Sequence, residues 1–117
     1  MNINTIHLGG NLTRDPEVRY SQGGTAFCSF SIAVNHSFKR GEDWIEKTLF
    51  MRCVVFKEAA TRFESQFKKG QACYVEGRFE LNEWEDKQGN KKQTPQVVVR
   101  TFQNMEPRRS KQGGQPP

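Results

Sequence analysis

The chain has 117 residues, with 18 lysines and arginines against 13 aspartates and glutamates, which gives a formal net charge of +5 at pH 7. This length supports one domain with a hydrophobic core and is too short for two. The sequence shows neither a signal-peptide pattern nor an apolar run approaching the roughly 20 residues of a membrane span, so we expect a cytoplasmic protein without membrane contact. The basic excess fits a polyanionic partner without requiring one.

The N-terminal segment reads as one strand followed by turns. Apolar and polar residues alternate over residues 5–12, which predicts a first strand with one face toward a core. The adjacent glycines Gly9 and Gly10 indicate a bulge or a sharp bend within it. Glycine, proline and serine then mark residues 15–24 as a turn-rich stretch.

A second strand over residues 26–34 leads through a polar hairpin tip, residues 39–43, into a third strand at residues 49–56. Successive side chains of this third strand point to opposite faces. One row can fill a core and consists of Met51, Cys53 and Val55. The other row presents two aromatic rings and a guanidinium, and consists of Phe50, Arg52, Val54 and Phe56. Rings flanked by cations predict a platform for single-stranded nucleic acid, since each stacked base contributes roughly 1–3 kcal/mol.

One helix interrupts the strands. The spacing of Ala60, Phe63 and Phe67 predicts an amphipathic helix over residues 58–69, and Gly70 follows as a stop signal. Strands are then predicted over residues 72–81, extending to residue 84, and over residues 96–102, with a loop at residues 86–92 between them.

The predicted order is three strands, one helix and two strands. This order favours an all-β fold, a five-stranded OB-fold Greek-key barrel with one helix between strands three and four, although a small α+β sheet could share it. We assign residues 1–106 to this domain. Residues 107–117 are too polar to bury a core, and we expect a disordered tail that either begins a longer tail or is truncated.

Four aromatic residues are the candidates for base stacking: Phe38, Phe50, Phe56 and Trp84. The alternative for each is that the ring fills core space. Trp44 stays open, because a loop tryptophan can stack on a base, contact a partner subunit or lie on its own hairpin.

Eight cations lie on or beside the predicted platform and are candidates for phosphate contacts: Arg19, Lys39, Arg40, Arg52, Lys57, Lys87, Lys91 and Lys92. Such contacts fix the path of a strand without reading its sequence. The ordinary reading of any one of them is solvated surface charge, and acidic residues dilute both predicted hairpins.

Nothing in the sequence predicts catalysis or a metal site. The two histidines lie in no recognised catalytic arrangement, and phosphate-loop, HExxH and GxSxG motifs are absent. The three cysteines, Cys28, Cys53 and Cys73, form no CxxC pair, which argues against both a disulfide framework and zinc. We expect three buried thiols, no cofactor and no enzyme activity.

Several motifs, in order, resemble those of bacterial single-stranded DNA-binding proteins. The opening signature of that family resembles residues 10–20, GNLTRDPEVRY, and further blocks resemble residues 30–35, 54–56, 67–70 and 74–78. The resemblance covers about residues 4–106. The four candidate rings fall where the family places its base-stacking residues, with phenylalanine at positions 38 and 50 where tryptophan is common, and Arg52 matches a basic position of the platform strand.

The resemblance implies a homotetramer of OB-folds, associated with the nucleoid, that coats single-stranded DNA during replication, recombination and repair. It implies no metal and no catalysis. The family's acidic tail tip, which recruits repair enzymes, has no counterpart in residues 113–117, GGQPP, so such recruitment is not expected of this sequence. The residues alone leave two alternatives open: an RNA-binding or primosomal OB-fold protein, and a protein-interaction module.

Overall fold

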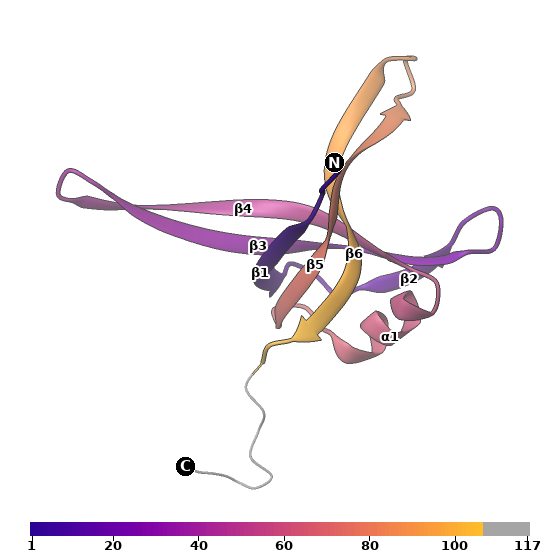
Figure 1. Ribbon diagram of the computed structural model, residues 1–117, viewed down its shortest axis with the longest axis horizontal. Helices are drawn as coiled ribbons and strands as arrows, with labels where there is room; N and C mark the ends of the chain where they lie inside the picture. Colours follow the sequence, from indigo (N-terminus) through magenta and orange to yellow (C-terminus); the bar gives the residue numbers. More distant parts are fainter. Residues whose placement is uncertain (107–117) are drawn as a thin grey trace, which may run out of the picture.

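The computed structural model describes residues 1–106 of the chain (Figure 1). In this part of the chain one helix follows four strands and precedes two more. The elements in chain order are β1 (Ile6–Leu12), β2 (Glu17–Tyr20), β3 (Ala26–Arg40), β4 (Asp43–Phe56), α1 (Glu58–Gln66), β5 (Ala72–Glu85) and β6 (Lys91–Asn104). The prediction for residues 107–117 lies outside the described residues.

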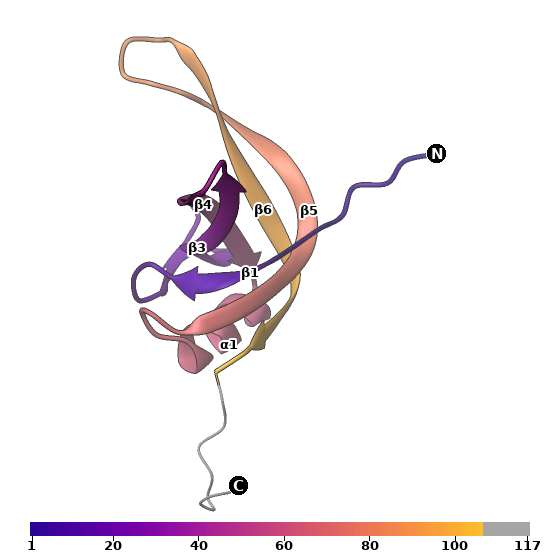
Figure 2. The same cartoon turned by 90° about the vertical axis from the view of Figure 1, so that its left-hand side faces the viewer.

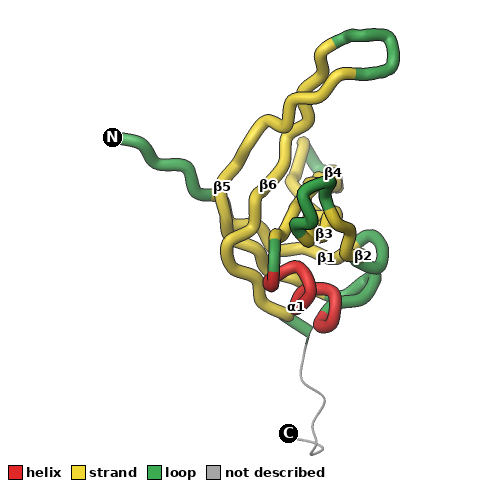
Figure 3. Tube along the Cα trace, turned by 90° about the vertical axis from the view of Figure 1, so that its right-hand side faces the viewer, coloured by secondary structure: helices red, strands yellow, loops and turns green. Residues whose placement is uncertain are grey.

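Five of these strands form a closed barrel. The hydrogen-bonded order is β1, β5, β6, β4 and β3, and β1 closes the ring by pairing with β3 at Asn11 opposite Ala33 and Leu12 opposite Ile32. The β4–β6 pair is parallel, whereas the other pairs are antiparallel. The helix between β4 and β5 lies at one end of the barrel (Figures 2 and 3). The predicted OB-fold is therefore confirmed.

The core lies between the barrel interior and α1. Phe63 of α1 stacks on Phe30 of β3 and on Phe67, with ring centroids 4.1 and 4.3 Å apart, and meets the edge of Phe102 from β6. All three cysteines are buried and free, as predicted. Burial raises the pKa of the Cys53 and Cys73 thiols to about 12, so both stay protonated at neutral pH.

The stretch predicted as turns contains a further strand, β2. It pairs with β3 on the side away from β4, and its Val18 contacts the core. A four-residue strand offers too short an alternation to be recognised in a turn-rich sequence, and the hydrogen bonds that define it come from the neighbouring strand.

The helix is shorter than predicted, ending at Gln66 rather than residue 69. Phe67 adopts extended backbone angles and is buried in the core, which turns the chain away from the helix axis. The two lysines that follow therefore lie in a loop, where Asp15 Oδ1 accepts the backbone N–H of Lys69 at 2.7 Å. Gly70 has a positive φ of 87°, in keeping with its predicted role after the helix.

Two hairpins extend well beyond the barrel. The β3–β4 arm and the β5–β6 arm point in different directions from the same core (Figure 1). The sequence placed the end of the second strand near residue 34 and the start of the last near residue 96, because apolar alternation fades there. Cross-strand pairing nevertheless continues to Arg40 opposite Asp43 and to Glu85 opposite Lys91. No helix among residues 1–106 is long and apolar enough to cross a membrane.

Of the two alternatives predicted at the adjacent glycines of β1, a bulge or a sharp bend, the bulge is wrong. Register with β5 runs unbroken from Ile6 to Asn11. A Cβ at Gly10 would instead collide with the backbone carbonyl of Ala33 in β3, whereas a Cβ at Gly9 would meet nothing within 4 Å. Gly10 is needed because β1 and β3 approach closely where the barrel closes.

We therefore expect Gly10→Ala to lower the free energy of unfolding by about 1–3 kcal/mol, because the added methyl group forces the two strands apart. Gly9→Ala is the matched control and should change it by less than about 0.5 kcal/mol, since its site is open. Urea unfolding of both variants measures the difference. Equal effects would contradict the close approach of β1 and β3.

Candidate nucleic-acid interface

The outward surface of the barrel carries a continuous face across four strands. Residues directly opposite in neighbouring strands point to the same side of a sheet. Arg52 of β4 lies between Ser31 of β3 and Gln96 of β6, and Gln96 lies opposite Glu80 of β5. We call this surface, with the outward residues of β3 to β6, the outer face. Platform residue Arg52 is exposed on it, as predicted.

Val54 departs from the expected exposure. It has the predicted outward parity but is only 4% exposed. Its neighbours in register are Ser29 on β3 and Val98 on β6, and Val98 is itself only 9% exposed, so the two valines share a buried part of the outward surface. Alternation within the strand predicted the side to which Val54 points but not the burial of its side chain.

A hydrogen-bonded network fixes Arg52 at the centre of the outer face. Its Nε donates to Gln96 Oε1 at 3.2 Å and its Nη2 donates to Ser29 Oγ at 3.2 Å. Gln96 is 6% exposed, and its Nε2 donates to Glu80 Oε1 at 2.9 Å. Glu80 also forms an ion pair with Arg78 at 3.3 Å. A buried amide that is satisfied on both sides holds the guanidinium in one orientation.

Three of the four predicted stacking rings are exposed on this side of the molecule. Phe50 and Phe56 flank Arg52 on the outward row of β4, and both are exposed. Trp84 of β5 is also exposed, and its indole Nε1 donates to Thr94 Oγ1 at 2.8 Å. Because the indole edge is held by β6, a face of the ring is left available for stacking.

Phe38 lies on the reverse side of the β3–β4 arm. It is opposite Ile45, whereas Phe50 is opposite Ala33, so the two rings have opposite parity across the ribbon. Phe38 is half-buried and stacks on His36 at 5.7 Å between centroids. Lys47 Nζ and the guanidinium of Arg40 each lie 5.9 Å from its ring centroid. The reverse side thus has its own ring with cations, and the structure does not bring all four rings onto one face.

Trp44, left open by the sequence, lies near the tip of the same arm. It is opposite Lys39 and has the parity of Phe50, which places it on the outward row. It is 69% exposed, more than any of the four stacking candidates. Packing on its own hairpin is therefore not its main environment.

The predicted cations divide between three places. Arg19 of β2 pairs with Glu17 at 2.8 Å and lines a hollow with Arg14, Phe27 and Arg52 beside the barrel. Lys39 and Arg40 lie on the β3–β4 arm. Lys57 follows Phe56 directly and has a positive φ of 63°, a conformation that costs a non-glycine residue about 1–3 kcal/mol.

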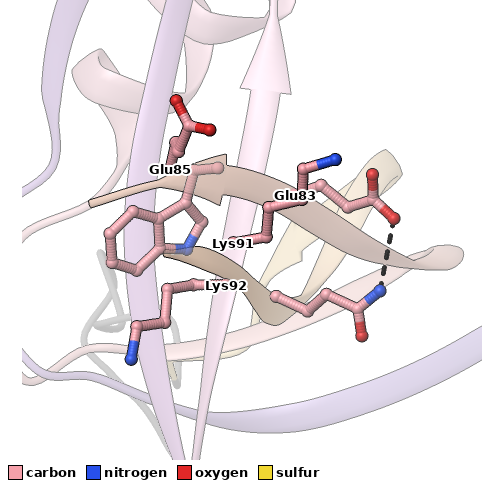
Figure 4. Close-up of a pocket in the computed structure, with 6 residues that line it drawn as sticks. Glu83, Glu85, Lys91 and Lys92 are labelled. Atoms are coloured by element: carbon pink, nitrogen blue, oxygen red, sulfur yellow. Dashed lines mark hydrogen bonds between the residues drawn. The ribbon is translucent and has the colours of Figure 1, made fainter. Parts of the chain in front are cut away.

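The remaining three cations belong to the β5–β6 arm, and Figure 4 shows two of them, Lys91 and Lys92. Lys92 lies opposite Trp84 and shares its side, whereas Lys91 lies opposite Glu85 on the other side together with Glu83. Lys87 is in the turn. Backbone N–H groups of Asn90 and Gln88 donate to Asp86 there, which lowers the pKa of its carboxyl and fixes the turn.

Several residues of the interface were missed from the sequence. Arg14 is in a loop, where strand periodicity gives no direction. His36 and Lys47 meet Phe38 only because His36 is opposite Lys47 in the hairpin, and this register is not visible in one strand alone. Asn82 and Thr94 flank Trp84 for the same reason, since they face each other across β5 and β6.

A closed five-stranded barrel with one helix and an outer face of rings and cations defines the class of oligonucleotide-binding folds. Residues 3–105 match the Single-strand binding protein family, and the chain belongs to that family. The resemblance drawn from the sequence motifs is confirmed.

Curated relatives and a solved structure agree with this assignment. Single-stranded DNA-binding protein 1 of Streptococcus agalactiae is 35% identical over 114 residues, which cover 97% of this chain and 69% of the relative. The single-stranded DNA-binding protein of Lactiplantibacillus plantarum is 39% identical over 91% of this chain and 52% of its own length. A structure described as Plasmodium falciparum SSB complex with ssDNA has a TM-score of 0.78, with 22% identity over 91% of this chain and 97% of that chain, and shows the fold.

Proposed function

We propose that this protein binds and protects single-stranded DNA during replication, recombination and repair. Binding does not depend on the base sequence of the DNA as a whole, and no catalysis is involved. The observation that carries the proposal is the outer face, where exposed rings of β4 and β5 flank a fixed arginine. Bases stack on such rings whatever their identity, and a basic surface draws the phosphates. The family and the names of its curated members support the same function.

We assign the parts of the site as follows. Phe38, Phe50, Phe56 and Trp84 stack on bases, with Phe38 serving a part of the strand that reaches the reverse side of its arm. Seven cations contact phosphates, namely Arg19, Lys39, Arg40, Lys57, Lys87, Lys91 and Lys92. Trp44 contacts DNA at the tip of the arm or a partner subunit. Residues 1–106 form the binding domain of a cytoplasmic, nucleoid-associated protein.

The proposal is tested by titrating the protein with an oligothymidylate at several salt concentrations. Log affinity should fall with log salt by about 0.7 for each phosphate contact, because binding releases counterions. Lys92→Ala, which removes a charge beside Trp84, should lower both the affinity and the magnitude of this slope. A salt-insensitive affinity would rule out the phosphate contacts.

The two tryptophans should report the strand differently. We expect an oligothymidylate to quench fluorescence strongly, with most of the fractional quench retained in Trp44→Phe and lost in Trp84→Phe. Trp84→Ala should weaken binding by about 1–3 kcal/mol, the contribution of one stacked base, without changing the oligomer. The reverse pattern of quenching would place the strand at the tip of the β3–β4 arm instead of over Trp84.

Assembly into a homotetramer is the third part of the proposal. In the described residues β1 pairs with β5 along its length but with β3 only at Asn11 and Leu12, so most of one edge is free for a second subunit. Exposed Leu49, Phe79 and Leu81 add apolar surface outside the core. Light scattering should give four chain masses with and without DNA. A single-chain mass at micromolar concentration would show the assembly to be wrong.

A further inference from the structure

A hollow of about 300 Å³ lies on the outer face between the β5–β6 arm and the barrel. It is lined by Arg52, Asn82, Trp84 and Thr94. Asn82 faces Thr94 directly across β5 and β6, Trp84 lies two residues further along β5, and Arg52 comes from β4. The hollow is largely open to solvent, and its single aromatic wall offers a stacking surface for one flat ring.

The groups around the hollow differ in what they offer. Trp84 provides an aromatic wall whose orientation is fixed by its hydrogen bond to Thr94 Oγ1. Arg52 uses Nε for Gln96 and one Nη2 hydrogen for Ser29, which leaves further N–H donors free to meet a ligand. Asn82 is half-buried, and its side-chain amide makes no hydrogen bond within residues 1–106. The site therefore combines a stacking wall with polar groups that converge on the edge of a ring.

The guanidinium of Arg52 belongs to a network that also contains a carboxylate. Gln96, which orients the guanidinium, is itself bonded to the Glu80 carboxylate at 2.9 Å. Glu80 is in turn paired with Arg78 at 3.3 Å, so its charge is partly neutralised and does not by itself exclude a phosphate at Arg52. The cations assigned to phosphates lie on the arms and beside the barrel, around this centre.

A guanidinium can only donate hydrogen bonds, so it distinguishes among bases by their acceptors. Thymine, cytosine and guanine each carry a carbonyl oxygen. Adenine has none, and its amino group lies beside N1 and N7, where it opposes a second donor. Asn82 does not add to this distinction, because an amide offers both a donor and an acceptor and can serve any base.

We propose that the hollow binds a single base stacked on Trp84, and that Arg52 there selects carbonyl-bearing bases against adenine through the N–H donors that Gln96 and Ser29 leave free. The inference rests on the proposed binding of single-stranded DNA. It adds one position at which the protein distinguishes among bases, whereas the other stacking contacts accept any base. It also changes the role of Arg52 from the one expected from the sequence.

The experiment compares the dissociation constants of oligodeoxyadenylate and oligothymidylate of equal length, as a ratio, for the wild-type protein and its variants. Stacking within free oligodeoxyadenylate is a property of the ligand and cancels when ratios are compared between variants. Arg52→Met should lower the ratio about fivefold, the lower end expected for losing one specific base contact. Arg52→Lys keeps the charge but loses the planar fork, so it should recover affinity without recovering the full ratio.

Arg40→Met is the matched control, because it removes the same residue type from the reverse side of the β3–β4 arm. It should weaken both ligands equally and leave the ratio unchanged. If Arg52→Met also weakens both equally, or if Arg52→Lys restores the wild-type ratio, Arg52 acts as a point charge and the selective hollow is wrong, while the proposed function stands. If the wild-type protein binds neither ligand, the proposed function itself fails. Should Arg52→Met not fold, the ratio of Arg52→Lys decides.

Discussion

Closure of the barrel between β1 and β3 is the constraint on which the rest of the structure depends. Because Gly10 lacks a Cβ, β1 can approach the Ala33 carbonyl and complete the ring. A closed ring fixes β3 and β4 relative to β5 and β6, and thereby fixes the β4 rings relative to Trp84. It also commits one row of every strand to the core, where α1 covers the end with Phe63. The residues of the opposite row are not needed for the core and can therefore serve binding.

The centre of the outer face contains a buried polar residue, Gln96, which needs hydrogen-bond partners. Gln96 is polar and nearly inaccessible to water, so its amide must be satisfied by protein groups. Glu80 accepts from one end of that amide and Arg52 donates to the other. An apolar residue at position 96 could be buried without hydrogen-bond partners, as its neighbours Val97 and Val98 are. The polar network is therefore better explained by the need to hold Arg52 in one orientation than by stability.

The sequence was informative wherever alternation within a single strand decides the answer. It separated Phe50 and Phe56 from Cys53 and Val55, placed the helix, and predicted the order of the five barrel strands along the chain. It was not informative where the answer depends on a partner strand. The side of Phe38 follows from its register with Ile45, the burial of Val54 goes with its pairing to Val98, and β2 follows from its pairing with β3. Nothing in the sequence indicated the positive φ of Lys57, because glycine is the residue expected in that conformation.

The two sides of the β3–β4 arm restrict the path of a bound strand. A two-stranded ribbon has no further strand at its edges to block passage, whereas the barrel beneath it is closed. Phe50 and Trp44 have one parity and Phe38 has the other, so the three rings do not share one side of the arm. A strand that stacks on Phe38 as well as on Phe50 must follow the twist of the arm or cross its edge. Arg40 and Lys47, both within 5.9 Å of the Phe38 ring, provide positive charge on the side where such a strand would arrive.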